Sequence, residues 1–593
     1  MSVESSAEPG ARRGFYAGFL LLLVALPWLP VNPFVIHLAQ TFIYTAIAVI
    51  GLNILLGLSG QMSLGQAGFY ALGSYGSALV ALRLGWPVPL AIAFGTFVAA
   101  VGGALVGAFA LRTRGLYLAM ATMAIGFVIE IVAQRWIGLT GGSMGLTAIP
   151  QFNFGGSDAM GFLYFAGASL LVVQVGADYV NDSFVGRRLR AIRESEAFAA
   201  AVGIAVPQWR AVTFAACAAL AGLGGALFAH QSGFVGSDAF TIRLSVSLLI
   251  AAVIGGLGTR RGPLLGTLIL LGLVEFSSGV EKYGLMIHGA VLLCVLLAFP
   301  QGAAGVLGKL GATWRKRESE PPVSSVRSGA LTVLSDLPKG AGLLVEGVSK
   351  SYAGVRAVDN ATIEVLPATI HGLIGPNGAG KSTLINVIAG QYRCDAGRIV
   401  FAGKDITSLS TAERARLGLA RTFQNLQLIE ALTAVENVQL GFSGKQNLVR
   451  DFAGWWRGRD FEATQRGEAL AIMAFLGIDH LAARLPAELS YGHRKLLELA
   501  RAVAQRPSLM LLDEPIAGLN AQEAREIAEV VRRFRNAGIT IILVEHNMEF
   551  VMSLCDSVSV LDHGQLIATG TPQQVQADTK VVSAYLGGGK RHD

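Results

Sequence analysis

The sequence predicts a polytopic α-helical membrane domain followed by an α/β domain with a phosphate-binding loop. Charged residues are unevenly distributed, because 27 of the first 310 residues are Asp, Glu, Lys or Arg, against 60 of the remaining 283. The first part is therefore about 9% charged and the second about 21%, which is close to the soluble norm of about 25%. A glycine-rich motif at 375–382 then indicates a phosphate site in the second part.

The composition of the whole chain already excludes several classes of protein. Its 593 residues are 52% hydrophobic and only 15% charged, which is unlike a wholly soluble protein. The net charge of +7 gives no support for a nucleic-acid partner, since the basic excess of the first part lies between apolar segments, as membrane topology requires. The four cysteines form no CxxC pair, so neither a zinc site nor a disulfide framework is predicted.

About ten membrane spans are predicted, because a bilayer-spanning helix needs about 20 mostly apolar residues. The first apolar segment lacks the small-residue cleavage pattern of a secretory signal, which favours a membrane helix. The weakest of the ten are 64–82, which is rich in Gly and Ser, and 244–258, which is short. The predicted spans are 15–30, 34–57, 64–82, 88–111, 115–135, 161–178, 209–230, 244–258, 263–279 and 284–300.

The basic residues between these spans predict their orientation. With the N-terminus inside, eight arginines lie on inner connections and four basic residues on outer ones, which follows the positive-inside rule. The inner ones are Arg112, Arg114, Arg187, Arg188, Arg190, Arg193, Arg260 and Arg261, and the outer ones are Arg83, Arg135, Arg243 and Lys282. We therefore expect a multi-pass protein of the cell (inner) membrane, in contact with its lipid, whose C-terminal domain is cytoplasmic.

Three regions follow from this division. Residues 1–310 form the membrane domain, and 341–593 form the nucleotide-binding domain. Between them, 311–340 contains Arg315-Lys-Arg317, Pro321-Pro322 and several Ser residues. Such a composition does not support a packed core, so this segment is predicted to be a flexible cytoplasmic linker.

Two kinds of residue inside the predicted spans are candidates for a transport path. The glycine-rich stretches 57–65 and 255–259 favour either close helix packing or helix breaks where transporters bind substrate. Glu130 and Glu275 fall within apolar segments, where a carboxylate is costly unless it faces a cavity or a partner. Both could instead lie at the outer ends of their helices, in water.

The motif at 375–382 reads Gly-Pro-Asn-Gly-Ala-Gly-Lys-Ser, with a predicted strand at 370–374 before it and a predicted helix at 383–389 after it. Glycines in such a loop let backbone N–H groups close around phosphate oxygens at a helix N-terminus. Lys381 is expected to reach the β- and γ-phosphates, and the Ser382 hydroxyl to hold Mg²⁺. The ATP-binding set is Gly375, Pro376, Asn377, Gly378, Ala379, Gly380, Lys381, Ser382 and Thr383.

Two later strands are predicted to complete this site. The apolar run from Leu509 ends in Asp513 and Glu514, and the run 539–544 ends at Glu545 and His546. Ligands lie at the carboxyl edge of such sheets. We expect Asp513 to bind Mg²⁺ and Glu514 to act as general base on the attacking water. The His546 imidazole is expected to hydrogen-bond the γ-phosphate.

Six elements in order resemble the ATPases of ABC transporters throughout 343–586. Leu489-Ser490-Tyr491-Gly492-His493 resembles their signature, Gln424 in Arg-Thr-Phe-Gln424-Asn their Q-loop, and Tyr352 the aromatic residue that stacks on adenine. The resemblance implies an ABC ATPase fold with a helical subdomain, roles for Gln424 in catalysis and in holding Mg²⁺, and contacts of Ser490 and Gly492 with ATP.

Three residues depart from the pattern of that family. Tyr491 and His493 replace the usual Gly and Gln of the signature, and Asn520 stands where Asp is common. Because Ser490 and Gly492 are present, we expect ATP hydrolysis to survive. In this family ATP lies between the phosphate loop of one ATPase domain and the signature of another. The resemblance therefore implies that a second chain completes each site.

The membrane half resembles the permease of branched-chain amino acid importers. The stretches 60–68, 114–120, 140–146 and 255–263 carry this likeness, and the ATPase half with its 440–470 insertion and Ala517-Gly-Leu-Asn520 resembles the ATPase of the same system. The segment 186–203 resembles the coupling loop of importers, with Glu196, Ala197 and Gly203 as its candidate contacts. From its residues alone, it also fits a basic helix held by anionic lipid.

The resemblance implies ATP-driven import of leucine, isoleucine and valine by a permease fused to its ATPase. The implied partners are a second permease, a second ATPase and a solute-binding protein, with a homodimer as the other assembly. Importers of urea, amides or aromatic carboxylates belong to the same family and stay open as alternatives. An ATPase anchored to the membrane without transport is a further alternative, which would hydrolyse ATP without moving solute.

Overall fold

The computed structural model describes residues 9–25, 32–110, 115–152, 158–277, 338–445 and 458–586, with a few positions between 286 and 305. The chain divides into two compact units, one of residues 1–194 with 206–319 and the other of residues 195–205 with 320–593. The short segment 195–205 therefore belongs to the second unit, although its neighbours on both sides belong to the first. Most of the predicted linker, 311–337, lies outside the described residues.

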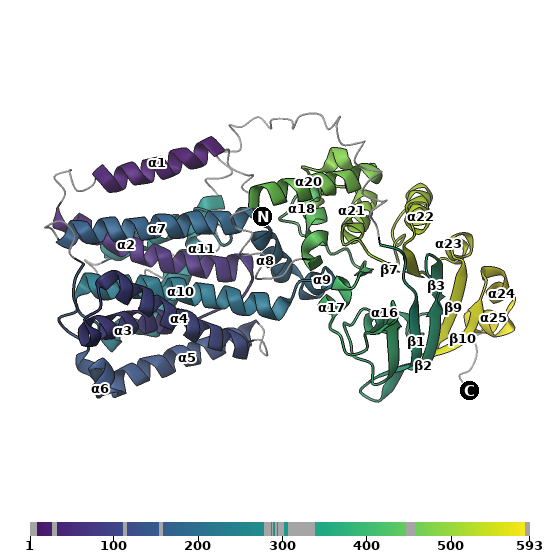
Figure 1. Cartoon of the computed structure of the whole chain (residues 1–593), viewed down its shortest axis with the longest axis horizontal. Helices are drawn as coiled ribbons and strands as arrows, with labels where there is room; N and C mark the ends of the chain where they lie inside the picture. Colours follow the sequence, from purple (N-terminus) through teal and green to yellow (C-terminus); the bar gives the residue numbers. More distant parts are fainter. Residues whose placement is uncertain are drawn as a thin grey trace. The chain divides into compact units, whose positions relative to one another are not determined.

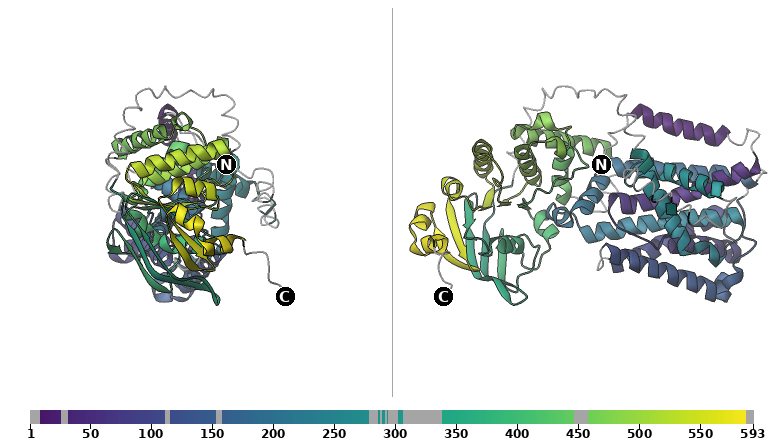
Figure 2. Two further views of the ribbon diagram at one scale, coloured as in Figure 1. Left: turned by 90° about the vertical axis from the view of Figure 1, so that its right-hand side faces the viewer. Right: turned by 180° about the vertical axis from the view of Figure 1, so that it is seen from behind.

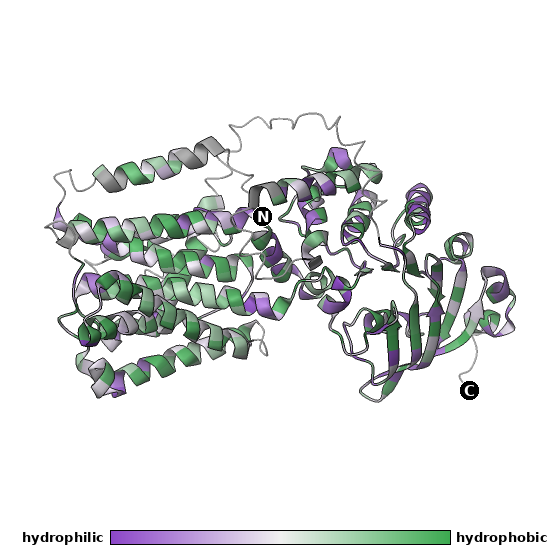
Figure 3. Ribbon diagram, in the orientation of Figure 1, coloured by the Kyte–Doolittle hydropathy of each residue, from purple (hydrophilic) through white to green (hydrophobic). Residues whose placement is uncertain are grey.

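The first unit is helical among the residues described (Figure 1). Its longer helices are α1 (Pro9–Ala25), α2 (Pro33–Leu52), α3 (Gln66–Leu84), α4 (Val88–Ala110), α5 (Leu116–Arg135), α7 (Asp158–Asp182), α8 (Phe184–Glu194), α10 (Val206–Ser232), α11 (Ile242–Gly255) and α12 (Gly262–Ser277). A π-helix, η2 (Asn53–Leu58), extends α2, and a short helix, α6 (Ile137–Thr140), follows α5. Figure 3 shows that helices such as α5 and α7 are apolar over most of their length.

Five helices in the described residues are long and apolar enough to cross a membrane, so the predicted count of about ten spans is not confirmed. They are Pro33–Leu58, Val88–Ala108, Leu116–Arg135, Met160–Asp182 and Val206–Ser232. Helices α1, α11 and α12 lie at other predicted spans but have only 17, 14 and 16 residues. Helix α3 has 19 residues, with Gly and Ser throughout and Arg83 in its last turn. The segment 284–300 lies almost entirely outside the described residues.

Small residues let α3, α4 and α10 pack closely. A Cβ atom on Gly73 would lie 2.0 Å from the carbonyl oxygen of Gly222, and one on Gly95 would lie 2.4 Å from the carbonyl oxygen of Gly73. Larger side chains at these positions would separate the helices. The packing of the first unit thus depends on backbone contact between helices, as in other membrane bundles.

The second unit contains two β-sheets. A four-stranded antiparallel sheet has the order β2-β1-β4-β5, and a six-stranded sheet has the order β10-β9-β3-β8-β7-β6, in which all pairs except β10 with β9 are parallel. The strands are β1 (Leu343–Tyr352), β2 (Val355–Val365), β3 (Ile370–Ile374), β4 (Ala396–Phe401), β5 (Lys404–Asp405), β6 (Leu419–Arg421), β7 (Leu509–Asp513), β8 (Thr540–Val544), β9 (Ser557–Asp562) and β10 (Gln565–Gly570).

Some helices of this unit pack beside the sheets, and others form a separate helical group. Figure 1 places α18, α20 and α21 together, which agrees with the predicted helical subdomain, and Figure 2 shows the C-terminal helices beside β9 and β10. The helices of this unit are α9 (Glu196–Ala201), α16 (Lys381–Ile388), α17 (Thr411–Arg416), α18 (Ala434–Gln439), α20 (Gly458–Phe475), α21 (Tyr491–Ala504), α22 (Ala521–Asn536), α23 (Met548–Leu554), α24 (Pro572–Ala577) and α25 (Thr579–Leu586). Strands β3, β7 and β8 are buried along their whole length, which explains their continuous apolar runs.

Candidate functional site

The loop between β3 and α16 needs glycine for two reasons. Gly375 and Gly380 have φ angles of +148° and +101°, which residues with a Cβ rarely adopt. A Cβ atom would also lie 2.1 Å from the Leu561 carbonyl oxygen at Gly375 and 2.2 Å from the Ala357 carbonyl oxygen at Gly380. The loop is therefore held against the neighbouring backbone, and α16 begins directly after it at Lys381, two residues before the predicted start at 383.

Lys381 lies across this loop. Its Nζ donates hydrogen bonds to the carbonyl oxygens of Gly375 (2.7 Å) and Pro376 (2.9 Å). Burial lowers the pKa of Lys381, and the nearby carboxylates of Glu514 and Asp513 oppose that shift. The β3 and β7 ends therefore bring together the cation and the two carboxylates that the sequence singles out.

The predicted carboxylates follow the last buried residues of β7. Asp513 is only 4% exposed, and burial raises the pKa of its carboxyl group, whereas the nearby Arg421 guanidinium lowers it. Glu514 has a φ of +47°, a left-handed conformation that is uncommon for a residue with a side chain. Its backbone N–H donates to the Val544 carbonyl oxygen at 2.9 Å, so the pairing of β7 with β8 continues through it.

Gln424 and His546 meet at Glu514. The Gln424 Nε2 donates to Glu514 Oε2 at 3.2 Å, and His546 Nδ1 lies 4.0 Å from Glu514 Oε1. Gln424 follows β6 and His546 follows β8, on either side of β7 in the sheet. Three strand ends thus place the amide, the carboxylate and the imidazole together. The apolar runs before Glu514 and His546 predict this edge for those two residues, whereas Gln424 was singled out by its resemblance to the Q-loop.

Sequence reasoning missed Arg421, the last residue of β6. Its Nη2 lies 3.5 Å from Asp513 Oδ2, and both side chains are at most 7% exposed. Burial lowers the pKa of Arg421, and Asp513 opposes that shift. The available signal was its position three residues before Gln424 on a strand parallel to β7, because such strands bring their ends to one edge.

Tyr352 at the end of β1 has an aromatic neighbour. Its ring centroid lies 5.7 Å from that of Tyr392, with the planes at 79°, and both residues are 40% exposed. Burial raises the pKa of Tyr352, and the nearby Thr383 side chain in α16 opposes that shift. Tyr352 is therefore beside the phosphate loop, and Tyr392 is a second aromatic residue there that the sequence analysis did not single out.

The signature residues sit at the start of α21. Ser490 caps the helix, accepting a hydrogen bond from the His493 N–H at 3.3 Å, and its hydroxyl lies 2.9 Å from His493 Nδ1. The Tyr491 ring lies 3.1 Å from where a Cβ atom of Gly518 would be. The unusual Tyr491 therefore packs on the loop before Asn520. That residue accepts hydrogen bonds from Gln522 N and Glu523 N at 3.0 Å, so its amide caps α22.

Comparisons with known families match both units. Residues 34–296 match a family model described as "Branched-chain amino acid transport system / permease component". A model for the ABC transporter matches residues 358–517, and one for the branched-chain amino acid ATP-binding cassette transporter matches residues 565–591.

Curated relatives decide the family. The high-affinity branched-chain amino acid transport ATP-binding protein LivG of Escherichia coli K12 is 36% identical over 250 residues, which are 41% of this chain and 97% of that protein. The chain belongs to the branched-chain amino acid ABC transporter family. Its membrane permease unit and its P-loop ABC ATPase are fused in one polypeptide.

Other members and one solved structure match the same part. BraF of Pseudomonas aeruginosa, a high-affinity branched-chain amino acid transport ATP-binding protein, is 36% identical over 251 residues, which are 41% of this chain and 97% of BraF. A crystal structure of a nucleotide-free ATP-binding cassette from an ABC transporter is 36% identical, covers 41% of this chain and 98% of its own, and has a TM-score of 0.37.

The donor set of this family member fits Mg²⁺. Ser382, Asp513 and the amide of Gln424 offer oxygen atoms, which are the ligands that Mg²⁺ prefers. No group of three His, Cys, Asp or Glu side chains suited to a metal ion exists among the described residues, so phosphate and water oxygens would have to supply the other ligands. Mg²⁺ in ATP sites is commonly held in this way.

The segment predicted to be the coupling loop packs within the ATPase unit. Helix α9 (Glu196–Ala201) begins after Ser195, which caps it, and its Phe198 is 1% exposed. Gly203 has a φ of +82°, and a Cβ atom there would lie 2.5 Å from the Gly444 Cα. Arg416 Nε donates to the Gly203 carbonyl oxygen at 3.1 Å. Glu196 and Ala197 are half-buried.

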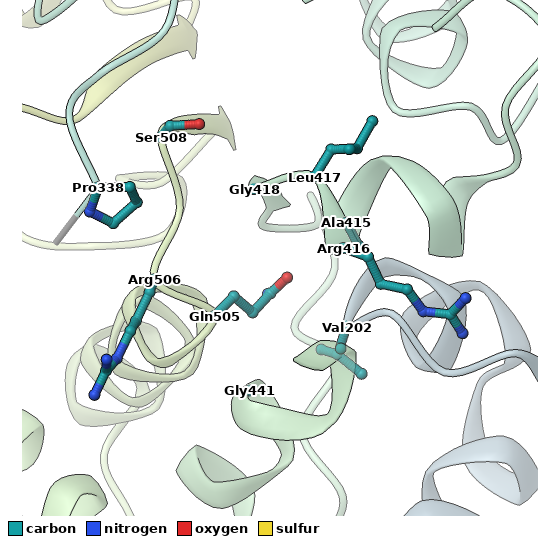
Figure 4. Close-up of a pocket in the computed structure, with 11 residues that line it drawn as sticks. Val202, Pro338, Ala415, Arg416, Leu417, Gly418, Gly441, Gln505, Arg506 and Ser508 are labelled. Atoms are coloured by element: carbon teal, nitrogen blue, oxygen red, sulfur yellow. The ribbon is translucent and has the colours of Figure 1, made fainter. Parts of the chain in front are cut away.

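A cavity of about 220 Å³ lies beside this segment (Figure 4). Val202, Pro338 and Gln505 contribute to its wall. In Figure 4 the guanidinium groups of Arg416 and Arg506 point away from its centre, and Arg506 pairs with Glu468 at 3.0 Å. Arg416 and Arg506 thus bind Gly203 and Glu468 and do not point into the cavity. The Gln505 carboxamide is a polar group of the wall that a ligand could contact.

The two glycine-rich stretches of the permease unit contact each other. A Cβ atom on Gly57 would lie 2.3 Å from the Gly258 backbone N. Asn53 joins the two stretches, because its Oδ1 accepts from Gly258 N at 2.8 Å and its Nδ2 donates to the Thr259 carbonyl oxygen at 3.0 Å. Arg193 of α8 donates to the Gly57 carbonyl oxygen. Close packing thus accounts for these glycines.

The two carboxylates predicted within spans lie on different helices. Glu130 of α5 lines a small cavity of about 10 Å³ together with Ala67 and Ser245. That volume holds about one water molecule. Glu275 lies near the C-terminal end of α12. A role of either residue in the transport path stays a prediction.

Proposed function

We propose that the chain imports leucine, isoleucine and valine across the cell (inner) membrane, driven by ATP that its own cytoplasmic domain hydrolyses. The observation that carries this proposal is the presence of a permease and an ATPase of one transport system in one chain. The names of LivG and BraF, which specify high-affinity branched-chain amino acid transport, support the substrate. Residues 1–310 would form the permease, 311–340 the linker and 341–593 the ATPase.

Each residue of the ATP site has a proposed role that follows from its position. Tyr352 would stack on the adenine, and the loop from Gly375 to Thr383 would surround the phosphates with backbone N–H groups. Ser382, Asp513 and Gln424 would hold Mg²⁺, which neutralises charge on the phosphates when bound. Arg421, paired with Asp513, would keep that carboxylate ionised and oriented despite its burial.

Glu514 would accept the proton of the attacking water. Its carboxylate is the group that Gln424 contacts and His546 approaches, so both neighbours would orient it and the γ-phosphate. A positioned general base contributes about 10²- to 10⁴-fold to a rate. Loss of water activation at Glu514 should therefore slow hydrolysis by about that factor.

A second ATPase domain is needed to complete each site. Ser490 contacts His493, the Tyr491 ring packs on Gly518, and a Cβ atom on Gly492 would lie 2.6 Å from Glu523 Oε1. None of these three neighbours is a phosphate-loop residue. We infer that Ser490 and Gly492 contact ATP bound by a partner, and that the working assembly contains a second permease, a second ATPase and a solute-binding protein. Co-purification of two differently tagged copies of this chain would establish a homodimer instead.

Competition for uptake tests the substrate. Cells that lack this chain would receive the wild-type gene, and the initial rate of labelled leucine uptake would be measured with an excess of valine, urea, a short amide or an aromatic acid. We expect only valine and isoleucine to reduce the rate. Inhibition by urea, amides or aromatic acids, or leucine uptake independent of the chain, would contradict the substrate assignment and favour another solute of the same family.

A further inference from the structure

A buried ion pair lies on one face of α21. Arg501 and Glu498 are 3% and 2% exposed, and Arg501 Nη2 lies 3.9 Å from Glu498 Oε1. Burial raises the pKa of Glu498 and lowers the pKa of Arg501, to about 10. Buried pairs of this kind often add little stability, because desolvation offsets their attraction. The contacts that the pair makes therefore indicate what it does.

On one side, the pair holds the segment that carries Gln424. Glu498 Oε1 accepts a hydrogen bond from the backbone N–H of Phe423, the residue before Gln424, at 3.2 Å. Arg501 Nη1 donates to the carbonyl oxygen of Gln427 at 2.5 Å. The backbone on both sides of Gln424 is thus hydrogen-bonded to one ion pair, at Phe423 and at Gln427, which lie four residues apart along the chain.

On the other side, Arg501 contacts the coupling segment. Its guanidinium carbon lies 4.0 Å from the centroid of the Phe198 ring, which is buried on α9. Cation–π contacts are worth about 2 kcal/mol or more when desolvated. Phe198, Arg501, Glu498 and Phe423 therefore form a continuous series of contacts from α9 to the residue beside Gln424.

We propose that Arg501 and Glu498 are positioning residues that relay movement of the Phe198 segment to Gln424, and so to its contact with Glu514. Displacement of α9 would shift the guanidinium, and the pair would carry the Phe423–Gln427 segment with it. Misplacement of a reacting group by about 1 Å costs about 10²-fold in rate. A small shift would therefore suffice to link hydrolysis to transport. This inference rests on the proposed function of the chain as a transporter.

A matched contact elsewhere in the ATPase unit provides a control. The Arg533 guanidinium carbon lies 3.7 Å from the centroid of the Phe475 ring. Phe475 lies on α20 and Arg533 on α22, and no contact described above joins them to the Gln424 segment. Phe475→Leu therefore removes the same type of contact without touching the proposed relay.

The experiment measures the number of leucine molecules imported per ATP hydrolysed. The full chain, purified with its associated subunits, would be reconstituted in proteoliposomes with leucine-loaded binding protein, for the wild type, Phe198→Leu, Arg501→Lys, the double variant and Phe475→Leu. We expect Phe198→Leu and Arg501→Lys to lower this ratio at least fivefold each. The double variant should match the single variants, since all break one series of contacts.

Three results would overturn the relay. They are a ratio that stays at the wild-type value although both rates fall, a similar loss in Phe475→Leu, and additive effects in the double variant. If Arg501→Lys fails to fold, Glu498→Gln replaces it, since the amide oxygen still accepts from Phe423 N–H. A wild-type preparation that imports no leucine would instead contradict the proposed substrate or transport function, which separates that failure from failure of the relay.

Discussion

Gln424 donates a hydrogen bond from Nε2 to Oε2 of Glu514 across 3.2 Å, which joins the segment after β6 to the residue after β7. Glu514 is held in a left-handed conformation with a φ of +47°. Such a conformation costs about 1–3 kcal/mol and persists only where the surroundings impose it. Here the contacts of Glu514 include the hydrogen bond from its backbone N–H to the Val544 carbonyl oxygen and one from Ala517 N–H to its own carbonyl oxygen. The candidate base is therefore aimed by the backbone as well as by its neighbours.

Replacement of Glu514 by Gln should abolish hydrolysis without preventing ATP binding. The amide keeps the size of the side chain but cannot accept a proton, so the rate should fall about 10²- to 10⁴-fold. Single-turnover hydrolysis and nucleotide binding by the purified full chain measure the two effects separately. A variant that retains more than a tenth of the wild-type rate would show that another residue is the base.

Replacement of Lys381 by Ala should weaken ATP binding. Its ammonium group lies over the phosphate loop, and hydrogen bonds of charged groups contribute about 1.5–3 kcal/mol. That range corresponds to a loss of affinity of roughly 10- to 150-fold. Titration with a fluorescent ATP analogue measures it, with Lys404→Ala on the exposed strand β5 as control. Equal affinities of the wild type and Lys381→Ala would contradict the assigned role.

Local patterns predicted the strands around the candidate site closely, because each strand lies in one short segment. The strand predicted at 370–374 and that predicted at 539–544 match β3 and β8, with one residue of difference in the latter. The contact of Phe198 with Arg501 joins residues more than 300 positions apart, and no local pattern specifies it. The left-handed conformation of Glu514 is likewise not specified by its local sequence, since Glu has no preference for it.

The membrane unit was predicted less well for a similar reason. Apolarity over about 20 residues identified Pro33–Leu58, Val88–Ala108 and Leu116–Arg135, because long apolar helices carry that signal in their own sequence. Helices α11 and α12 are shorter than a simple span. The contact between Gly57 and Gly258 likewise depends on tertiary packing, which span prediction does not include.

Replacement of Arg414 by Met should destabilise the ATPase unit. Arg414 is 1% exposed and donates to four carbonyl oxygens, those of Leu409, Val387, Ile388 and Thr407, at 2.7–3.0 Å. Each buried acceptor left unpaired costs about 1–3 kcal/mol. We expect the free energy of unfolding to fall by at least about 3 kcal/mol.

Thermal unfolding of the full chain measures this effect. A loss of about 3 kcal/mol should lower the Tm of the ATPase transition by roughly 6 °C or more. Arg398→Met is the control, because its pair with Asp405 is exposed on both sides and such surface pairs contribute little to stability. A Tm for Arg414→Met within 1 °C or so of the control would contradict a structural role for those hydrogen bonds.

The ATPase unit should become less stable as the pH is lowered, because of His371. This residue is 1% exposed on β3 and lies 2.8 Å from Ser557 Oγ and 3.0 Å from Ser559 Oγ. Burial lowers the pKa of His371 from 6.5 to about 4. Between these values the unfolded chain binds the proton and the folded chain does not, so folding weakens as pH falls below about 6.5.

The contribution of His371 should be about 1 kcal/mol between pH 7.5 and pH 5.5. Comparison of Tm over this range for the wild type and His371→Gln isolates it, because Gln cannot take up a proton. We expect the variant to lose less Tm on acidification than the wild type. Equal slopes for the two proteins would mean that His371 does not govern the acid response.

Leucine uptake by cells that carry Glu514→Gln tests the central claim, that one chain couples its own ATP hydrolysis to solute entry. Cells lacking the chain would receive the wild type or the variant, with equal amounts of each confirmed in the membrane. We predict that the wild type restores concentrative uptake of labelled leucine and that Glu514→Gln does not, although it still binds ATP. Equal uptake by the two strains, or none by the wild type while its purified protein hydrolyses ATP, would contradict the account.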